Sequence, residues 1–208
     1  MDIKLIEKYA LENNVPIMQM DGIEFLTKYI KENNIKNILE IGTAIGYSAI
    51  KMALVDSDIH VTTIERETDR YEIAIKNIKG FNLQDKIKVI HADAFDVNLT
   101  DTYDLIFIDA AKSQYIKFFE KFTKNLKVGG VVVSDNLDFH GLINSNLDEL
   151  SSNVRGIITK LNRYINFLKE NNDYKTTFYN IGDGISVSIK LWYWYFFKGV
   201  KYENNSNA

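Results

Sequence analysis

The feature that most constrains the fold is a regular alternation of apolar runs and helical segments that begins at residue 37. Five runs rich in Ile, Val, Leu and Phe have the texture of buried strands, at 37–41, 60–64, 87–91, 103–108 and 130–134. Segments with helical periodicity lie between them at 46–54, 68–79 and 113–124. Strands joined through helices are typical of a parallel sheet with right-handed crossovers. The chain is therefore predicted to have an α/β fold.

The segments on both sides of this alternation are predicted to complete the same domain. Two amphipathic helices precede it, and Asp21 with Glu24 forms a box-like start to the second one. After it come a helical stripe at 154–168 and two strand-like runs at 175–180 and 185–190, around the tight turn Gly182-Asp-Gly184. We expect one domain over residues 1–190, with a seven-stranded, mainly parallel sheet whose last strand is antiparallel.

Composition excludes several kinds of site. The 208 residues include no cysteine, so the chain has no thiolate zinc site, no iron–sulfur cluster and no thiol nucleophile. The net charge of −3 means that the chain lacks the overall positive potential that is typical of nucleic-acid-binding proteins. The N-terminus lacks the apolar core of a signal peptide, and the apolar run 191–197 is shorter than the roughly 20 residues that span a bilayer. We expect a cytoplasmic protein with no membrane partner.

The C-terminal stretch 191–208 is predicted to lie outside the domain. It is aromatic and then polar, and it holds both tryptophans of the chain. An extra strand, a dimer contact and a local feature with no part in the chemistry all fit this composition.

The run Leu39–Ser48 indicates a ligand site after the first strand. A strand leads into Gly42, a short loop, Gly46 and then a helix, and glycines there let a ligand approach the backbone. A plain strand–helix turn would look the same. Glu65 ends the second strand, where nucleoside-binding sheets hold the ribose hydroxyls, although a solvated loop glutamate also fits. Asp93 ends the third strand and is placed to accept from an adenine amino group or to cap the next turn.

Acidic residues at the ends of the next two strands predict a metal site. Asp109 follows the fourth strand, and Asp135 with Asn136 follows the fifth. Neighbouring parallel strands bring their carboxyl ends together, so these side chains offer three oxygen ligands that suit Mg²⁺, with Mn²⁺ or Ca²⁺ as alternatives. Lys112 lies three residues after Asp109, either as a general base or as a surface lysine that opens the next helix. No pair among His60, His91 and His140 has helical metal-ligand spacing.

These motifs together resemble the cation-dependent class I O-methyltransferases, which include catechol and caffeoyl-CoA O-methyltransferases. The resemblance is carried by ILEIGTAIGYSAIKMA, Glu65, YDLIFIDAAKSQY and GGVVVSDN, and it covers residues 15–190. It implies a Rossmann-like, seven-stranded class I methyltransferase fold that uses S-adenosylmethionine and a divalent metal, in a chain expected to form a homodimer. It implies Asp109, Asp135 and Asn136 as metal ligands, and Lys112 and Asp109 as catalytic residues. The residues implied around the cofactor are Met18, Glu40, Gly42, Tyr47, Ser48, Glu65, Asp93, Ala94 and Asp109.

Within that family the chain looks most like the bacterial tRNA 5-hydroxyuridine methyltransferases. The stretches concerned are 15–18, 42–49, 155–168 and 182–188. They imply methylation of the 5-hydroxyl of a wobble uridine to 5-methoxyuridine. The acid-free stretch 154–169, with its four basic residues Arg155, Lys160, Arg163 and Lys169, fits a tRNA partner and equally an ordinary solvated helix. Two alternatives stay open, a small catechol-like acceptor with the same two adjacent oxygens and a non-catalytic nucleoside- or RNA-binding module.

Overall fold

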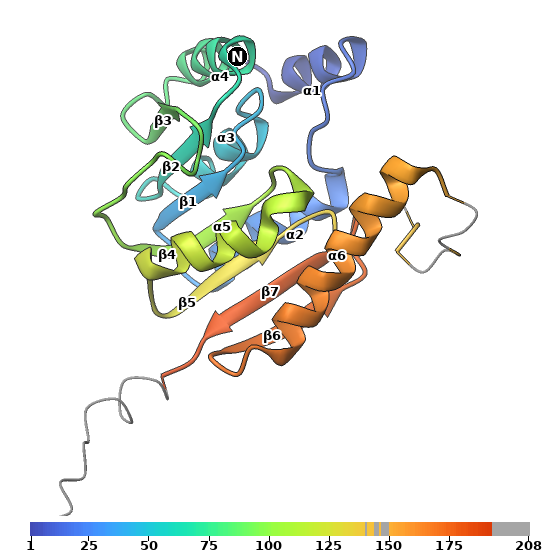
Figure 1. Ribbon diagram of the computed structural model, residues 1–208. Helices are drawn as coiled ribbons and strands as arrows, with labels where there is room; N and C mark the ends of the chain where they lie inside the picture. The colour runs from blue at the N-terminus through green and yellow to red at the C-terminus, as the bar shows by residue number, and fades with distance from the viewer. Residues whose placement is uncertain (140, 144–145, 147–149, 193–208) are drawn as a thin grey trace, which may run out of the picture.

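The computed structural model describes residues 1–139, 141–143, 146 and 150–192, and a seven-stranded sheet lies at its centre (Figure 1). The strand order is β3-β2-β1-β4-β5-β7-β6. Strands β1 to β5 run parallel, whereas β7 is antiparallel to both of its neighbours, β5 and β6. The strands are β1 (Asn37–Ile41), β2 (His60–Glu65), β3 (Ile87–His91), β4 (Tyr103–Ile108), β5 (Leu126–Ser134), β6 (Tyr174–Tyr179) and β7 (Ile185–Lys190). The predicted α/β fold, with its antiparallel last strand, is confirmed.

Helices cover both faces of the sheet. Figure 1 shows α5 and α6 in front of it and α2 behind it. The helices are α1 (Ile3–Glu12), α2 (Met20–Glu32), α3 (Tyr47–Ala53), α4 (Thr68–Gly80), α5 (Tyr115–Phe122) and α6 (Ser152–Glu170), with short 3₁₀ turns η1 (Lys112–Gln114) and η2 (Thr123–Asn125) on either side of α5.

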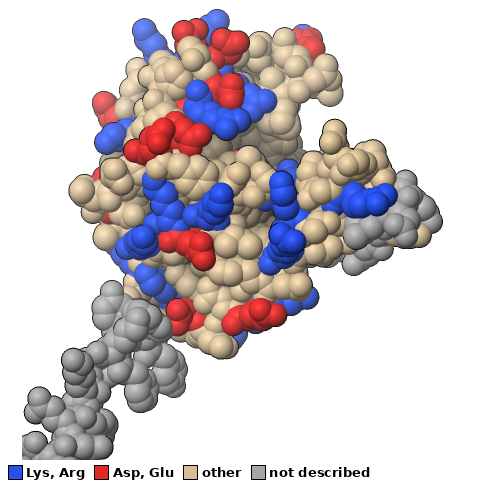
Figure 2. Space-filling model, in the orientation of Figure 1, with Lys and Arg blue, Asp and Glu red and all other residues tan. Residues whose placement is uncertain are grey.

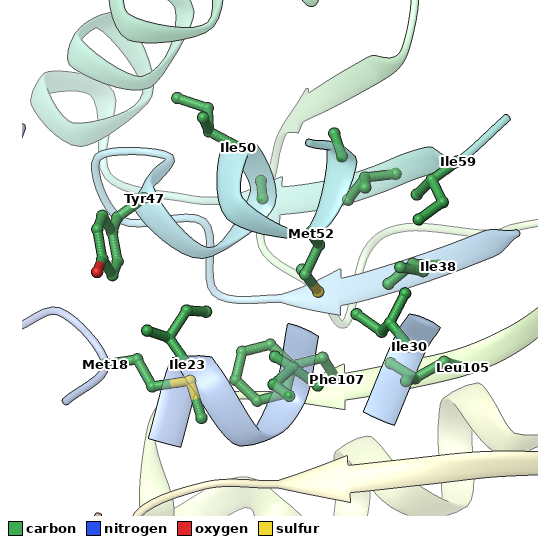
Figure 3. Close-up of a cluster of buried hydrophobic side chains, with 14 of the residues drawn as sticks. Met18, Ile23, Ile30, Ile38, Tyr47, Ile50, Met52, Ile59, Leu105 and Phe107 are labelled. Atoms are coloured by element: carbon green, nitrogen blue, oxygen red, sulfur yellow. The ribbon is translucent and has the colours of Figure 1, made fainter. Parts of the chain in front are cut away.

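The two faces of the sheet hold separate hydrophobic cores because successive strand residues point to opposite sides. In β4, Leu105 and Phe107 join the core under α1–α4, whereas Ile106 and Ile108 join the core under α5 and α6. Figure 3 shows the first of these cores, with Met18 beside α2. A strand buried on both faces has no polar alternation, which explains the continuous apolar runs of the sequence.

Two local predictions were wrong, and a third was confirmed. The capping box at Asp21 does not form, because α2 begins at Met20 with Gln19 as its N-cap. Asp21 instead accepts hydrogen bonds from the backbone N–H groups of Gly22 (2.9 Å) and Gly182 (3.0 Å). Strand β5 starts at Leu126 rather than at residue 130. The predicted tight turn forms, since the N–H of Gly184 donates to the carbonyl of Ile181 at 3.0 Å, and the contact with Asp21 joins the loop 180–184 to α2.

Most of the C-terminal stretch lies outside the described residues. Only Leu191 and Trp192 of 191–208 are described, and Trp192 is exposed beside Gly129. The proposed extra strand or dimer contact in this stretch therefore stays a prediction.

Candidate active site

A pocket of about 900 Å³ lies where β1, β2, β3 and β4 end. Ten of the residues singled out in the sequence line it: Met18, Gly42, Tyr47, Ser48, Glu65, Asp93, Ala94, Asp109, Lys112 and Asn136. Glu40 and Asp135 do not line it, although each contacts a residue that does. The parallel strands thus gather nearly the whole predicted site at one edge of the sheet.

The turn after β1 depends on glycine. Gly42 has φ +100°, and a Cβ atom built there would lie 2.1 Å from the carbonyl oxygen of Asp109. The N–H groups of Gly42 and Thr43 both donate to the carbonyl of Ile64, at 3.1 and 3.2 Å. Gly46, with φ +84°, then starts α3. Only a residue without a side chain lets β1 pass this close to the end of β4, so the pocket floor forms where the two strand ends meet.

Glu65 is fixed in the pocket wall by backbone groups. Its Oε2 accepts from the N–H of Ala44 at 2.8 Å, and its Oε1 accepts from the N–H groups of Arg66 and Glu67, both at 2.9 Å. A carboxylate has about four lone-pair positions, so after these three bonds about one is left to accept from a hydroxyl of a bound ribose. The predicted ribose-binding role fits this geometry.

Glu40 lies behind the pocket rather than in its wall. Its carboxyl group accepts hydrogen bonds from the hydroxyls of Ser48 and Thr63, both at 2.5 Å, and the Thr63 hydroxyl lies 2.6 Å from that of Thr43. Burial raises the pKa of Glu40 to about 8, against the opposing effect of the two hydrogen bonds. Ser48 and Thr43 line the pocket and Glu40 does not, so Glu40 is connected to the pocket through Ser48 and, by way of Thr63, through Thr43.

The part of the pocket that Asp93 lines also contains two aromatic residues that the sequence did not point to. Phe95 and Phe118 both line the pocket, and their rings stack with centroids 4.9 Å apart. The preceding Asp93 accepts from the N–H of Phe95 at 2.8 Å and lies 3.9 Å from Arg66 Nη1. Asp93 therefore caps its own turn, as the structural alternative proposed, and still faces the pocket. A phenylalanine directly after Asp93-Ala94 was the available signal.

Asp109, Asp135 and Asn136 meet as predicted. The side-chain amide of Asn136 donates to Asp109 Oδ1 at 3.2 Å and to Asp135 Oδ2 at 3.0 Å. Burial, and then the neighbouring Asp109 charge, raises the pKa of Asp135 to about 7, and burial also raises the pKa of Asp109. The main chain around Asp135 is anchored as well, because the Tyr115 hydroxyl donates to its carbonyl at 3.1 Å.

This cluster fits a hard divalent cation. Two neighbouring carboxylates repel each other when both are ionised, and a divalent cation between them would stabilise the ionised pair. The amide oxygen of Asn136 would complete a set of oxygen donors after a half-turn of the amide group. In the described part of the chain, no group of three or more His, Cys, Asp or Glu side chains is arranged to hold a metal. His60 and His91 are accordingly not placed as ligands, and His140 lies outside the described residues.

Two further charged residues bear on this cluster. Lys112 begins η1 and lines the pocket, and its charge lowers the pKa of Asp109 against the effect of burial. Its Nζ lies 5.7 Å from the ring centroid of Phe139, within reach of a cation–π interaction. Asp183 is 4 % exposed in the loop before β7, and its charge raises the pKa values of Asp109 and Asp135. The sequence Gly182-Asp-Gly184 predicted only a turn, and nothing in it pointed to the proximity of Asp183 to Asp109 and Asp135.

Comparison with known proteins agrees with this geometry. The O-methyltransferase family model matches residues 3–191. A caffeoyl-CoA O-methyltransferase of Populus kitakamiensis is 28 % identical over 194 residues, which cover 89 % of this chain and 82 % of that protein. A crystal structure from Staphylococcus aureus, of a protein assigned by name to the caffeoyl-CoA O-methyltransferases, has a TM-score of 0.87 and 40 % identity, and the match covers 91 % of this chain and 92 % of that one.

A second solved structure supports S-adenosylmethionine as the cofactor. An O-methyltransferase of Bacillus cereus, described as a complex with SAH, has a TM-score of 0.77 and 25 % identity, and the match covers 90 % of each chain. No helix in the described part of the present chain is long and apolar enough to cross a membrane. The chain belongs to the O-methyltransferase family, as an S-adenosylmethionine-dependent O-methyltransferase of the caffeoyl-CoA O-methyltransferase type.

Proposed function

We propose that this enzyme methylates the 5-hydroxyl of 5-hydroxyuridine in tRNA and depends on a divalent cation held by Asp109, Asp135 and Asn136. The observation that carries the choice of RNA is the position of the basic helix α6. It packs against η1, the turn that presents Lys112 to the pocket. A phosphate backbone that follows α6 would therefore run beside the place where the acceptor base must lie.

The charge on α6 supports this choice. Arg155, Lys160, Arg163 and Lys169 are all exposed, and the helix holds no acid before its last residue, Glu170. Figure 2 shows lysine and arginine side chains along this part of the surface. Lysines and arginines that neutralise phosphates supply much of the affinity for nucleic acids, so the helix suits tRNA even though the net charge is negative.

The residues of the site divide the chemistry between them. A divalent cation, when bound, would lower the pKa of the acceptor hydroxyl and orient it through the neighbouring 4-carbonyl. Lys112 in its neutral form would take the hydroxyl proton. Glu65 would hold the cofactor ribose, and the pocket walls would keep the methyl group in line with the oxygen. The C–S bond to the methyl group breaks as the new O–C bond forms, and S-adenosylhomocysteine leaves.

The decisive experiment is nucleoside mass spectrometry of tRNA from a strain that lacks this gene. We expect 5-methoxyuridine to disappear and 5-hydroxyuridine to accumulate, and the purified enzyme with Mg²⁺ and S-adenosylmethionine to reverse the change. Unchanged tRNA nucleosides, together with no methyl transfer to hydroxylated tRNA in vitro, would reject the proposal. A cytoplasmic location and a homodimer are predicted alongside it.

The second candidate is methylation of a small metabolite with two adjacent oxygens. The names of the relatives favour it, since they include caffeoyl-CoA and flavonoid methyltransferases. Such an acceptor would present the same pair of oxygens to the cation. Turnover of catechols by enzyme that ignores hydroxylated tRNA would establish this alternative.

A further inference from the structure

One buried polar atom in the pocket wall, Oε1 of Gln114, has no role in the proposed mechanism. Gln114 is the last residue of η1 and lines the pocket. Its side-chain oxygen Oε1 is buried and has no hydrogen-bond partner in the described part of the chain. A buried acceptor without a partner is costly in a folded protein, and such atoms call for a structural explanation. In the wall of a binding pocket, the simplest one is a hydrogen bond from the ligand.

The backbone that carries Gln114 is held firmly. Its N–H donates to the carbonyl of Ala111 at 2.8 Å, which closes the 3₁₀ turn. The next residue, Tyr115, is 1 % exposed and is tied through its hydroxyl to the carbonyl of Asp135. The same turn begins with Lys112. Gln114 is thus fixed relative to both the predicted base and the predicted metal site.

Its position favours the acceptor over the cofactor as the donor to this oxygen. The donors of the cofactor nucleoside are expected to face Glu65, the last residue of β2, and Asp93, which follows β3. Gln114 instead follows β4, on the turn of the residue that is expected to receive the proton from the acceptor hydroxyl. The side chain of Gln114 would therefore lie near the edge of the acceptor ring that carries the two chelating oxygens.

We propose that Gln114 Oε1 accepts a hydrogen bond from the N3–H of the acceptor uracil and thereby selects a hydroxyuridine over a catechol. The inference rests on the proposed function. In 5-hydroxyuridine the 5-hydroxyl and the 4-carbonyl face the cation, and N3–H is the next group along the ring. A catechol offers a C–H at that position, so it would leave the buried oxygen unpaired. Sites built to hydrogen-bond a substrate discriminate strongly against analogues that lack the donor.

The test compares 5-hydroxyuridine with its 3-deaza analogue, in which a C–H replaces N3–H and the 4-oxygen becomes a hydroxyl. Because every enzyme variant meets the same two acceptors, the change in preference between variants reports on Gln114. The wild-type enzyme, with Mg²⁺ and S-adenosylmethionine, should prefer 5-hydroxyuridine by roughly tenfold or more in kcat/KM, the value of one hydrogen bond to a buried acceptor. Gln114→Leu, which removes the acceptor at similar volume, should reduce that preference toward one. Gln114→Glu keeps an acceptor oxygen and should retain part of the preference. Ser113→Ala, an exposed neighbour on the same turn, is the matched control and should keep all of it.

Each contrary result has a distinct reading. An equal loss on both acceptors in Gln114→Leu would show a purely structural role and overturn the inference. So would a large rise in the dissociation constant of S-adenosylmethionine, measured by calorimetry, because the oxygen would then serve the cofactor. Wild-type enzyme that turns over neither nucleoside and no hydroxylated tRNA would overturn the proposed function, and the role of Gln114 with it.

Discussion

The two halves of the pocket differ in how far the protein satisfies its own polar groups. On the cofactor side, Glu65 accepts three backbone hydrogen bonds and Asp93 caps its own turn. On the acceptor side, Asp109 lines the pocket beside the buried Asp135, and both carboxyl groups have raised pKa values. The first half is preorganised without a ligand, whereas the second is electrostatically incomplete. Cofactor binding and metal-dependent chemistry should therefore be separable by mutation.

The largest separation is expected from Asp135→Ala. Loss of one of two carboxylate ligands should lower methyl transfer by about a thousandfold or more, since metal activation of the hydroxyl contributes several kcal/mol. The dissociation constant of S-adenosylmethionine should change little, because Asp135 does not line the pocket. Single-turnover assays and calorimetry measure the two quantities, and wild-type enzyme with EDTA is the parallel control. Full activity in the variant or in EDTA would remove the metal from the mechanism.

Glu65→Ala should have the opposite pattern. Loss of hydrogen bonds to a charged group is worth about 1.5–3 kcal/mol, so the affinity for S-adenosylmethionine should fall roughly 10- to 100-fold. The backbone N–H groups of Ala44, Arg66 and Glu67 would lose their acceptor as well, which adds to the effect. Glu72→Ala, an exposed carboxylate on α4, is the matched control. Equal affinity in both variants would show that Glu65 is only a loop residue.

Glu40, behind the cofactor side of the pocket, makes the stability of the fold depend on pH. A carboxyl group whose pKa is raised to about 8 stabilises the fold fully below its unfolded value near 4.5, and this stability is lost as the pH rises toward 8. Stability should fall by up to about 1.4 kcal/mol per pH unit across that window. Glu40→Gln should flatten this fall in denaturant titrations between pH 5 and pH 9. The same slope in variant and wild type would mean that Glu40 is ionised in the native protein.

The smallest effect is expected outside the pocket, on α6. Arg155→Ala combined with Arg163→Ala should reduce the slope of log K against log salt for tRNA binding by about two, one for each lost phosphate contact. Lys28→Ala with Lys31→Ala, an exposed pair on α2 across the sheet, should leave the slope unchanged. Equal slopes in the two double variants would exclude α6 as the RNA-binding surface.

The site residues that could be predicted from the sequence are those at the ends of strands. Buried strands end in acids for reasons other than packing, so Glu65, Asp109 and Asp135 could be found from the sequence. Asp183 could not, because nothing local shows that the loop before β7 folds against the ends of β4 and β5. Gln114 was hidden for a similar reason, since a missing hydrogen bond is visible only in three dimensions. Asp21 was misread because a distant partner, the N–H of Gly182, replaced the local cap.

The insertion of β7 between β5 and β6 has a consequence for synthesis. The last strand of the sheet to be synthesised occupies an interior position. The edge of β5 at Val131–Val133 therefore stays unpaired until Ile185–Lys190 have been synthesised. Pairings between segments so distant in the sequence form slowly, and an exposed apolar edge is prone to associate with other chains. A nascent chain halted before Ile185 would contain every residue of the proposed metal site and still lack the strand that completes the sheet beside it.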